Sequence, residues 1–365
     1  MKLVIAAGGT GGHIFPALAV ARALRERIRD VSLLWIGTSR SRERELCEKN
    51  GIRLRVIDVT GLRGKADIKA ARALWSFVRE VARLRAFFGG NRYDAVLAFG
   101  GYVSAPVLTA ARMCSIPYFL HEQNTVMGKV NRFFARRAEC TFLSFPLAAG
   151  PGRSITTLLT GMPVKKNNST YDSFHYPQGF DRSKKCVLIS GGSQGAASMN
   201  RCLIEPVKRL LAEDIQVVWQ TGTPTFEEVR AAMARFANAF VFDSLDDLYP
   251  YYAAAKLVVC RAGSSTLNEA AYFGLPCVMI PLPWSADNHQ WMNAGLVEGQ
   301  GWGVRVAQDN GCGTAVVESV RKLLADSAAY ERLCRRALDH NPENAAEKIV
   351  TAIIDMLGIN NAPVS

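Results

Sequence analysis

The sequence lacks the residue patterns of several common site types. Its nine cysteines are odd in number and include no C-x-x-C pair, and D-x-D and H-x-x-x-H patterns are also absent. These absences argue against a disulfide framework and a zinc site, and no metal or cofactor is expected. The cysteines are instead predicted to be reduced and mostly buried thiols of a cytoplasmic protein.

Membrane-spanning and dinucleotide signatures are missing as well. The two long uncharged stretches, residues 95–111 and 270–286, are interrupted by glycine and proline, whereas a spanning helix needs about 20 apolar residues. The apolar run at the N-terminus is too short for a signal peptide, so no targeting segment is evident. No G-x-G-x-x-G pattern follows a predicted strand, which disfavours a dehydrogenase.

The positive charge is concentrated in one half of the chain. Residues 1–164 carry 25 Lys and Arg against 11 Asp and Glu, whereas residues 165–365 carry 19 against 21. A one-sided basic region is typical of proteins that meet nucleic acid, anionic lipid or a phosphorylated ligand. The length of 365 residues and the hydrophobic content of 49% predict two globular domains, each with its own core.

Two glycine-rich turns stand at corresponding places in the two halves. Gly8–His13 follows the apolar run Lys2–Ala7 and precedes a helical pattern, and Gly191–Ala196 has the same setting further on. Glycines let the backbone approach a ligand, and the helix that follows directs its free N–H groups at it. One such turn could be a tight strand-to-helix connection, but two copies predict two Rossmann-like α/β domains facing one another across a cleft.

Further polar loops follow predicted strands. Gly100–Ser104 follows strand 93–99, and Glu122–Asn124 follows strand 116–121. Open α/β sheets bind ligands at the carboxyl ends of their strands. In the second half, Ser264, Ser265 and Thr266 open a helix and suit a diphosphate, while Glu269 could accept hydrogen bonds from a ribose diol or serve as a capping carboxylate.

Residues 67–88 form a long helical pattern with two interpretations. Apolar residues on one face predict packing against the sheet, with a solvated basic face formed by Lys69, Arg72, Arg79 and Arg83. The alternative is a surface helix that rests on anionic lipid, supported by Trp75, Phe87 and Phe88.

The expected domains are residues 1–164 and 165–342. Residues 165–185 are predicted to be a linker because they show no clear periodicity. A last helix, 343–357, is expected to return to the first domain.

In combination these segments resemble the MurG family of UDP-N-acetylglucosamine transferases. The resemblance is carried, in the family's order, by Gly8–His13 with Phe15-Pro16, Phe99–Tyr102, His121–Asn124, Gly191–Ala196 and Arg261–Ser264 with Glu269. It implies a GT-B glycosyltransferase that moves GlcNAc from UDP-GlcNAc to the 4-hydroxyl of MurNAc in undecaprenyl-diphosphate-linked MurNAc-pentapeptide, lipid I, with inversion. The product, lipid II, serves peptidoglycan synthesis.

The resemblance also implies the partners and the place of action. They are UDP-GlcNAc, lipid I and an anionic membrane surface, with no nucleic acid. The protein would act at the cytoplasmic face of the bacterial plasma membrane, as a peripheral protein.

Carried over by motif, the resemblance assigns roles to individual residues. His13 is the candidate general base, because imidazole titrates near neutrality, and Glu122 is a second catalytic candidate. Gly100, Gly101 and Tyr102 would meet the acceptor diphosphate. The residues implied to contact the donor substrate are Thr10, Gly11, Gly12, Asn124, Lys165, Ser193, Leu245, Ser264, Ser265, Thr266, Leu267, Asn268, Glu269 and Gln290. For His13, a helix-capping or loop-bonding role is the alternative.

The sequence departs from the family pattern at two positions. Lys165 stands where the family usually has arginine, and it keeps the charge but loses the bidentate geometry. His289 replaces the first of two glutamines, while Gln290 is kept.

Other functions remain open from the sequence. A UDP-GlcNAc 2-epimerase or a transferase with a soluble acceptor would share the fold, although the basic first half disfavours a soluble acceptor. A catalytically silent binding protein at the membrane is the alternative from another class.

Overall fold

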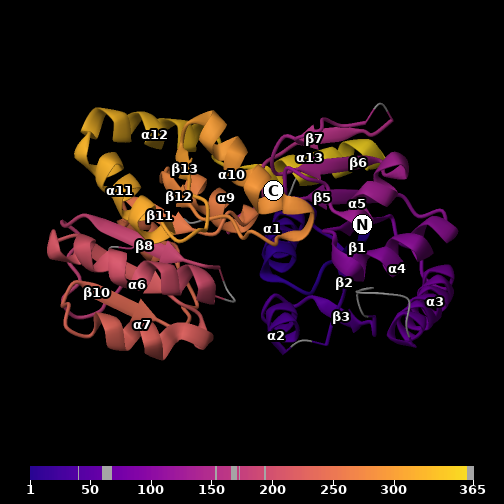
Figure 1. The fold of residues 1–365 in the computed structure, drawn as a ribbon. Helices are drawn as coiled ribbons and strands as arrows, with labels where there is room; N and C mark the ends of the chain where they lie inside the picture. The colour runs from indigo at the N-terminus through magenta and orange to yellow at the C-terminus, as the bar shows by residue number, and fades with distance from the viewer. Residues whose placement is uncertain are drawn as a thin grey trace. The chain divides into compact units, whose positions relative to one another are not determined.

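The computed structural model describes residues 1–39, 41–59, 68–152, 154–165, 171, 173–192 and 195–359, with backbone alone at 41–42 and 68–70. The chain divides into two compact units (Figure 1). Unit 1 comprises Met1–Lys166 and Glu343–Ser365, and unit 2 comprises Asn167–Pro342.

Unit 1 is built on a parallel sheet of seven strands in the order β3-β2-β1-β4-β5-β6-β7. Its strands are β1 (Lys2–Ala6), β2 (Ser32–Gly37), β3 (Arg53–Val56), β4 (Ala95–Ala98), β5 (Tyr118–Glu122), β6 (Cys140–Leu143) and β7 (Thr157–Leu159). The central strands β1, β4 and β5 are buried apart from Lys2, because helices cover both faces of the sheet.

Strand β1 shows how the two layers form. Leu3 and Ile5 pack on one face, with α1 (Gly11–Arg27) and α13 (Ala345–Leu357). Val4 and Ala6 pack on the other face, with α3 (Ile68–Gly89) and α4 (Gly101–Met113). The remaining helices of unit 1 are α2 (Ser41–Lys49), α5 (Lys129–Phe134) and the short η1 (Ala135–Arg137).

Unit 2 repeats this plan with six parallel strands in the order β10-β9-β8-β11-β12-β13. They are β8 (Cys186–Ser190), β9 (Gln216–Gln220), β10 (Ala239–Phe242), β11 (Leu257–Cys260), β12 (Cys277–Met279) and β13 (Gly303–Arg305). The two parallel, helix-covered sheets confirm the predicted fold class of paired Rossmann-like domains.

One face of the second sheet is covered by α6 (Ala197–Ala212) and α11 (Cys312–Ala325), which also pack against each other. The other helices are η2 (Thr223–Thr225), α7 (Phe226–Met233), α8 (Tyr249–Ala254), α9 (Ser264–Tyr272), η3 (Ala286–Asn288), α10 (His289–Gln300) and α12 (Ser327–Asp339).

The structure corrects the prediction of a linker over residues 165–185. Tyr176 stacks on Phe180 and lies edge-on to Tyr251 of α8, while its hydroxyl donates to the Pro250 carbonyl oxygen at 2.9 Å. Residues 173–185 are thus attached to unit 2 by aromatic side chains, which the lack of periodicity did not reveal. Residues 166–170 and 172 lie outside the described part of the chain.

Helix α3 departs from the prediction that its apolar residues share one buried face. Leu74, Trp75 and Val78 are 56%, 63% and 57% exposed, whereas Val81 and Phe88 are buried. Only the second half of the apolar pattern is buried, so the first half leaves an apolar surface.

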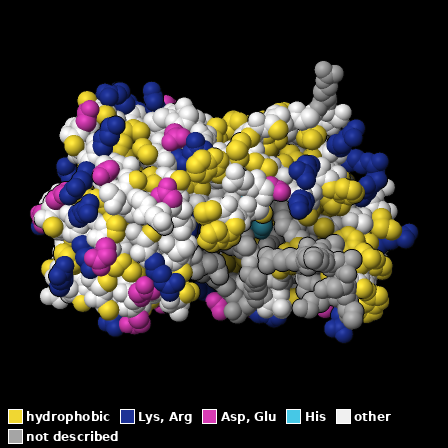
Figure 2. All heavy atoms as spheres, viewed as in Figure 1, with side chains coloured by type: hydrophobic (Ala, Val, Ile, Leu, Met, Phe, Trp, Pro, Cys, Tyr) yellow, Lys and Arg dark blue, Asp and Glu magenta, His cyan; other side chains and the backbone are white. Residues whose placement is uncertain are grey.

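The basic residues of α3 are only partly available for a ligand. The Arg79 guanidinium forms an ion pair with Asp58 at 3.0 Å, and Arg83 pairs with Glu80 at 2.8 Å. Arg72 is exposed, and the Lys69 side chain lies outside the described residues. Figure 2 shows hydrophobic side chains among Lys and Arg over the part of unit 1 that contains α3 and α4, whereas on unit 2 acidic side chains are interspersed with Lys and Arg.

Candidate functional site

In unit 1 the polar loops meet where the strand order reverses. Strand β1 lies between β2 and β4, and ligands of open α/β sheets bind outside the carboxyl ends of strands at such a point. A Cβ built on Gly101 would lie 3.2 Å from His13 Cε1, and one on Gly9 would lie 3.3 Å from Tyr102 Cε1. The loops after β1 and β4 therefore form one surface, at which the predicted residues Gly11, Gly12 and Gly100 also lie.

His13 lies in the first turn of α1, which begins at Gly11. Its Nδ1 is 3.3 Å from the Gly8 carbonyl oxygen and 3.3 Å from Thr10 Oγ1. Burial lowers the pKa of His13 below its usual value, with the Gly8 carbonyl acting in the opposite direction. The ring is therefore neutral at pH 7, and a proton held on Nδ1 by Gly8 leaves Nε2 as the basic nitrogen.

Glu122 ends strand β5 and is buried. One carboxylate oxygen accepts from the backbone N–H of Asn124 at 3.0 Å, and the other from the N–H of Gly128 at 2.9 Å and Asn131 Nδ2 at 2.8 Å. Burial raises its pKa against the effect of these donors. Both oxygens serve to order the loop that carries Asn124.

Unit 2 has the same reversal at β8, which lies between β9 and β11. Gly195 ends the turn after β8 at a φ of +71°, and its missing Cβ avoids the Thr221 carbonyl oxygen. Ser193, which was predicted to contact the donor, lies outside the described residues.

Arg261 joins three segments at this edge. It follows β11 directly, and its guanidinium donates to the Ile280 carbonyl oxygen and to Ser198 Oγ, both at 2.9 Å. The side chain is buried and so acts within the protein, tying α6 and the segment after β12 to the β11–α9 loop.

Helix α9 begins at Ser264, as the sequence predicts for an anion-binding helix N-terminus. Ser265 and Thr266 are half-buried in its first turn. Leu267 and Asn268 are fully buried, and Asn268 donates to the Ser264 carbonyl oxygen at 2.9 Å. The side chains of Leu267 and Asn268 therefore pack inside the protein, and their implied contact with the donor stays a prediction.

Glu269 lies one turn further along α9. The hydroxyl of the buried Tyr252 donates to Glu269 Oε2 at 3.1 Å. Burial raises the pKa of Glu269 to about 7, with the Tyr252 hydrogen bond lowering it and nearby Asp247 raising it. Strongly shifted pKa values occur most often at functional sites, which makes Glu269 a candidate functional residue.

The other predicted residues lie at loops and element ends. Leu245 is half-buried in the loop after β10, and Gln290 Oε1 accepts from the Leu282 N–H at 2.9 Å. His289 Nδ1 contacts the Ala286 carbonyl oxygen at 2.7 Å. Lys165 is exposed next to the boundary of unit 1.

Three side chains that support the site were not predicted in this role from the sequence. Tyr252 and Asn131 hydrogen-bond the two carboxylates Glu269 and Glu122, and Arg261 joins three segments at the edge of the second sheet. Tyr252 and Asn131 stand inside ordinary helical segments, and no local signal marks them. Arg261 was noted only as part of a motif, although an arginine directly after a buried strand is a usable signal.

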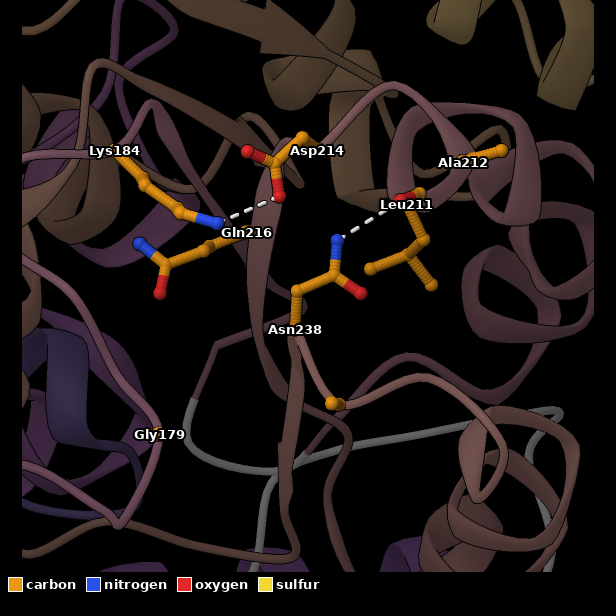
Figure 3. Close-up of a pocket in the computed structure, with 8 residues that line it drawn as sticks. Gly179, Lys184, Leu211, Ala212, Asp214, Gln216 and Asn238 are labelled. Atoms are coloured by element: carbon orange, nitrogen blue, oxygen red, sulfur yellow. Dashed lines mark hydrogen bonds and ion pairs between the residues drawn. The ribbon is translucent and has the colours of Figure 1, made fainter.

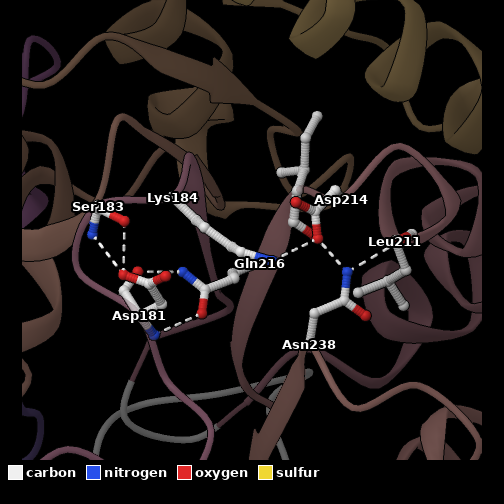
Figure 4. A network of polar contacts seen from close by, with 8 residues as sticks. Asp181, Ser183, Lys184, Leu211, Asp214, Gln216 and Asn238 are labelled. Carbon is white, nitrogen blue, oxygen red and sulfur yellow. Dashed lines mark hydrogen bonds and ion pairs between the residues drawn. The ribbon is translucent and has the colours of Figure 1, made fainter.

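A separate pocket lies at the opposite, amino edge of the second sheet (Figure 3). Lys184 pairs with Asp214 at 2.7 Å, and the Gln216 side chain exchanges two hydrogen bonds with the backbone of Asp181 (Figure 4). Asn238 donates to the Leu211 carbonyl oxygen at 2.9 Å. These groups satisfy one another, so the pocket joins residues 173–185 to the sheet rather than presenting ligand-binding atoms.

No cluster of three or more His, Cys, Asp or Glu side chains with metal-binding geometry occurs within the described ranges. In the same part of the chain, none of the helices combines the length and apolar character that crossing a bilayer requires.

Comparison with known proteins decides the family. The profiles of the glycosyltransferase family 28 N-terminal and C-terminal domains match residues 3–143 and 186–349. A protein of Geobacter metallireducens named UDP-N-acetylglucosamine--N-acetylmuramyl-(pentapeptide) pyrophosphoryl-undecaprenol N-acetylglucosamine transferase is 35% identical, over 96% of this chain and 97% of its own. The chain belongs to the MurG family.

Solved structures agree with this family membership. The crystal structure of Acinetobacter baumannii MurG has a TM-score of 0.76 and 28% identity, covering 97% of this chain and 99% of its own. The crystal structure of the UDP-GlcNAc 2-epimerase of Neisseria meningitidis has a TM-score of 0.67 at 14% identity. The match covers 97% of this chain and 100% of the epimerase chain. The epimerase shares the fold alone, whereas MurG relatives share sequence along their whole length.

Proposed function

We propose that the chain transfers GlcNAc from UDP-GlcNAc to the 4-hydroxyl of MurNAc in lipid I, which yields lipid II for peptidoglycan synthesis. The observation that carries the proposal is the match, over almost the whole chain, to relatives that bear this activity in their name. The convergence of the β1 and β4 loops around a neutral histidine supports it.

In unit 1 we assign the base to His13. Its Nε2 takes the proton from the acceptor 4-hydroxyl while that oxygen attacks the anomeric carbon of GlcNAc. The bond from the anomeric carbon to the UDP oxygen breaks on the opposite side, so the configuration inverts and UDP leaves with the electron pair. A neutral imidazole is already in the required protonation state at pH 7.

Glu122 has a positioning role in this proposal. Its two oxygens are occupied by the N–H groups of Asn124 and Gly128 and by Asn131, so it orders Asn124 rather than touching the reacting atoms. The backbone N–H groups at Gly101 and Tyr102, at the start of α4, suit the acceptor diphosphate. Thr10, Gly11, Gly12 and Asn124 keep their assignment to the donor.

In unit 2 the assignments to UDP-GlcNAc follow the chemistry of each group. The first turn of α9, Ser264–Thr266, suits the diphosphate, since its free N–H groups and dipole favour an anion. The Glu269 carboxylate accepts from the ribose diol. Gln290 uses Oε1 within the protein, so a sugar hydroxyl would meet its Nε2. Leu245 and Ser193 are the remaining residues assigned to UDP-GlcNAc, and Lys165 contributes a positive charge near the donor phosphates.

The acceptor is a lipid, and we place its docking on the exposed part of α3. Leu74, Trp75 and Val78 form an apolar patch next to the exposed Arg72, and apolar side chains beside cations suit an anionic bilayer surface. The protein would thus act as a peripheral protein at the cytoplasmic face of the plasma membrane.

The test is a transfer assay with purified protein, UDP-GlcNAc and a short-chain lipid I analogue. We expect release of UDP and an acceptor whose mass grows by one N-acetylhexosamine, both measured by mass spectrometry. Conversion of UDP-GlcNAc to its 2-epimer without acceptor would support the epimerase instead. Binding of UDP-GlcNAc with neither reaction would support a silent binding protein.

A further inference from the structure

Two cysteines of unit 2 lie against each other although they are far apart in sequence. Cys202 is in the middle of α6, and Cys312 is the first residue of α11. Their Sγ atoms are 3.4 Å apart, and the Cys202 Sγ is also 3.2 Å from the Met199 carbonyl oxygen. A disulfide has an S–S bond of about 2.05 Å, so closure of little more than 1 Å would join the two sulfurs.

The packing of the helices holds the two sulfurs at this distance. A Cβ on Gly313, the residue after Cys312, would collide with the Cys202 carbonyl oxygen and with the Pro206 ring. Glycine at this point lets α11 approach α6 closely. The thiols are therefore brought together by the close contact of two helices and not by a mobile loop.

The two thiols differ in access and in reactivity. Cys202 is half-buried and Cys312 fully buried. The hydrogen bond with Cys312 lowers the pKa of Cys202, and the charge of Arg261 acts in the same direction against the effect of burial. The thiolate is the nucleophilic form of cysteine, so Cys202 is the thiol that meets an oxidant first.

We propose that Cys202 and Cys312 are an oxidation site, at which a hydroperoxide converts two thiols into a disulfide between α6 and α11. The Cys202 sulfur attacks the peroxide oxygen, forming a sulfenic acid and releasing water when the oxidant is hydrogen peroxide. The Cys312 sulfur then displaces the sulfenic hydroxyl as a second water. Two thiols are oxidised by two electrons, and one peroxide is reduced to two waters.

The site connects to the loops assigned to the donor. Ser198, one turn before Cys202 on α6, accepts a hydrogen bond from Arg261 at 2.9 Å, and Arg261 precedes the Ser264 loop. Closure of the disulfide shifts this turn of α6, so the oxidised protein should bind UDP-GlcNAc more weakly. This consequence rests on the proposed function, whereas the disulfide itself does not.

The experiment treats the reduced full-length protein with hydrogen peroxide, blocks remaining thiols with N-ethylmaleimide and maps peptides without reduction. We expect a crosslinked peptide pair containing Cys202 and Cys312 that disappears with dithiothreitol. Cys202→Ser should abolish it. The matched control Cys334→Ser removes another half-buried thiol, one hydrogen-bonded to Tyr330, and should leave the crosslink intact.

Two results would overturn the proposal. One is a Cys202 that ends as sulfinic acid with Cys312 still reduced. The other is a crosslink between the fully buried neighbours Cys260 and Cys277 in place of this pair. Thermal unfolding of Cys202→Ser shows whether that variant is folded. Cys312→Ser removes the second thiol of the pair and should also abolish the crosslink.

Donor binding is measured separately, by calorimetry with UDP on oxidised, re-reduced and Cys312→Ser protein after peroxide. We expect a several-fold loss of affinity in the oxidised wild type alone, restored by dithiothreitol. Equal affinity in all three would overturn the effect on the donor loops. Absence of UDP binding to the reduced protein would instead count against the proposed function, which separates the two failures.

Discussion

His13 is held neutral by burial, and its ring is oriented by the Gly8 carbonyl oxygen. Replacing it with alanine should lower kcat by about 10²–10⁴-fold, the usual contribution of a general base, with little change in UDP-GlcNAc affinity. Transfer kinetics and calorimetry measure the two effects. His175→Ala, at an exposed histidine of unit 2, is the control and should be silent. Turnover of His13→Ala at the wild-type rate would remove the residue from the mechanism.

The proposed contact of Glu269 with the donor predicts a pH dependence of donor binding, because burial raises the pKa of Glu269 to about 7. Only the ionised carboxylate accepts two hydrogen bonds from a ribose diol, so UDP affinity should rise between pH 6 and pH 8. At saturating donor, kcat should instead depend on the neutral form of His13. Because the pKa of His13 is lowered, kcat should stay high below pH 6.5. Titration calorimetry measures the UDP affinity across this pH range. An affinity that does not change with pH would contradict the assignment of Glu269 to the ribose.

Tyr252 offers a sharper variant of the same test. Its hydroxyl lowers the pKa of Glu269 through the 3.1 Å hydrogen bond, so Tyr252→Phe should move the binding midpoint to higher pH. At pH 7 the affinity for UDP should fall by about tenfold, on the scale of a lost hydrogen bond to a charged group. Tyr249→Phe, on the same helix, is the matched control. A loss of affinity equal at all pH values would indicate structural damage instead.

At the scale of elements, α3 separates into a buried half and an exposed half. Changing Trp75 to alanine together with Val78 to serine should weaken binding to vesicles of anionic phospholipid by about tenfold or more, from the lost apolar burial. Because both side chains are more than half exposed, the unfolding temperature should hardly change. Vesicle sedimentation measures the effect, with the exposed Trp284→Ala of unit 2 as control. Equal binding by all variants would leave the patch without a membrane role.

The elements also show how far sequence reasoning reached. The strands β1, β4 and β8 are predictable because strands buried on both faces are short apolar runs. The loops after them are marked by glycines, and a loop that follows a parallel strand lies at the carboxyl edge of the sheet. The exposure of Leu74 and Val78 was not predictable, because it depends on how α3 lies against α4. The contact of Tyr252 with Glu269 depends on where α8 and α9 pack, which no local pattern encodes.

The whole molecule consists of two units, each with its own sheet and core. We expect two calorimetric unfolding transitions, since separate domains unfold as separate cooperative units. Ile353 of α13 is fully buried in the core of unit 1, so Ile353→Ala should destabilise one transition by about 2–5 kcal/mol. Val316→Ala, in the core of unit 2, should lower the midpoint temperature of the other transition. A single transition shifted by both variants would show that the units unfold together.

The return of α13 to unit 1 has a mechanical consequence. Both chain ends belong to unit 1, where α13 packs on α1, so unit 2 is an insertion between two parts of its neighbour. A force applied at Met1 and at the end of α13 loads unit 1 first, because β1 is held in its sheet and α13 in its core. Unit 2 carries no tension until β1 or α13 is pulled out of unit 1. The inserted unit is thus mechanically shielded by the one into which it is inserted.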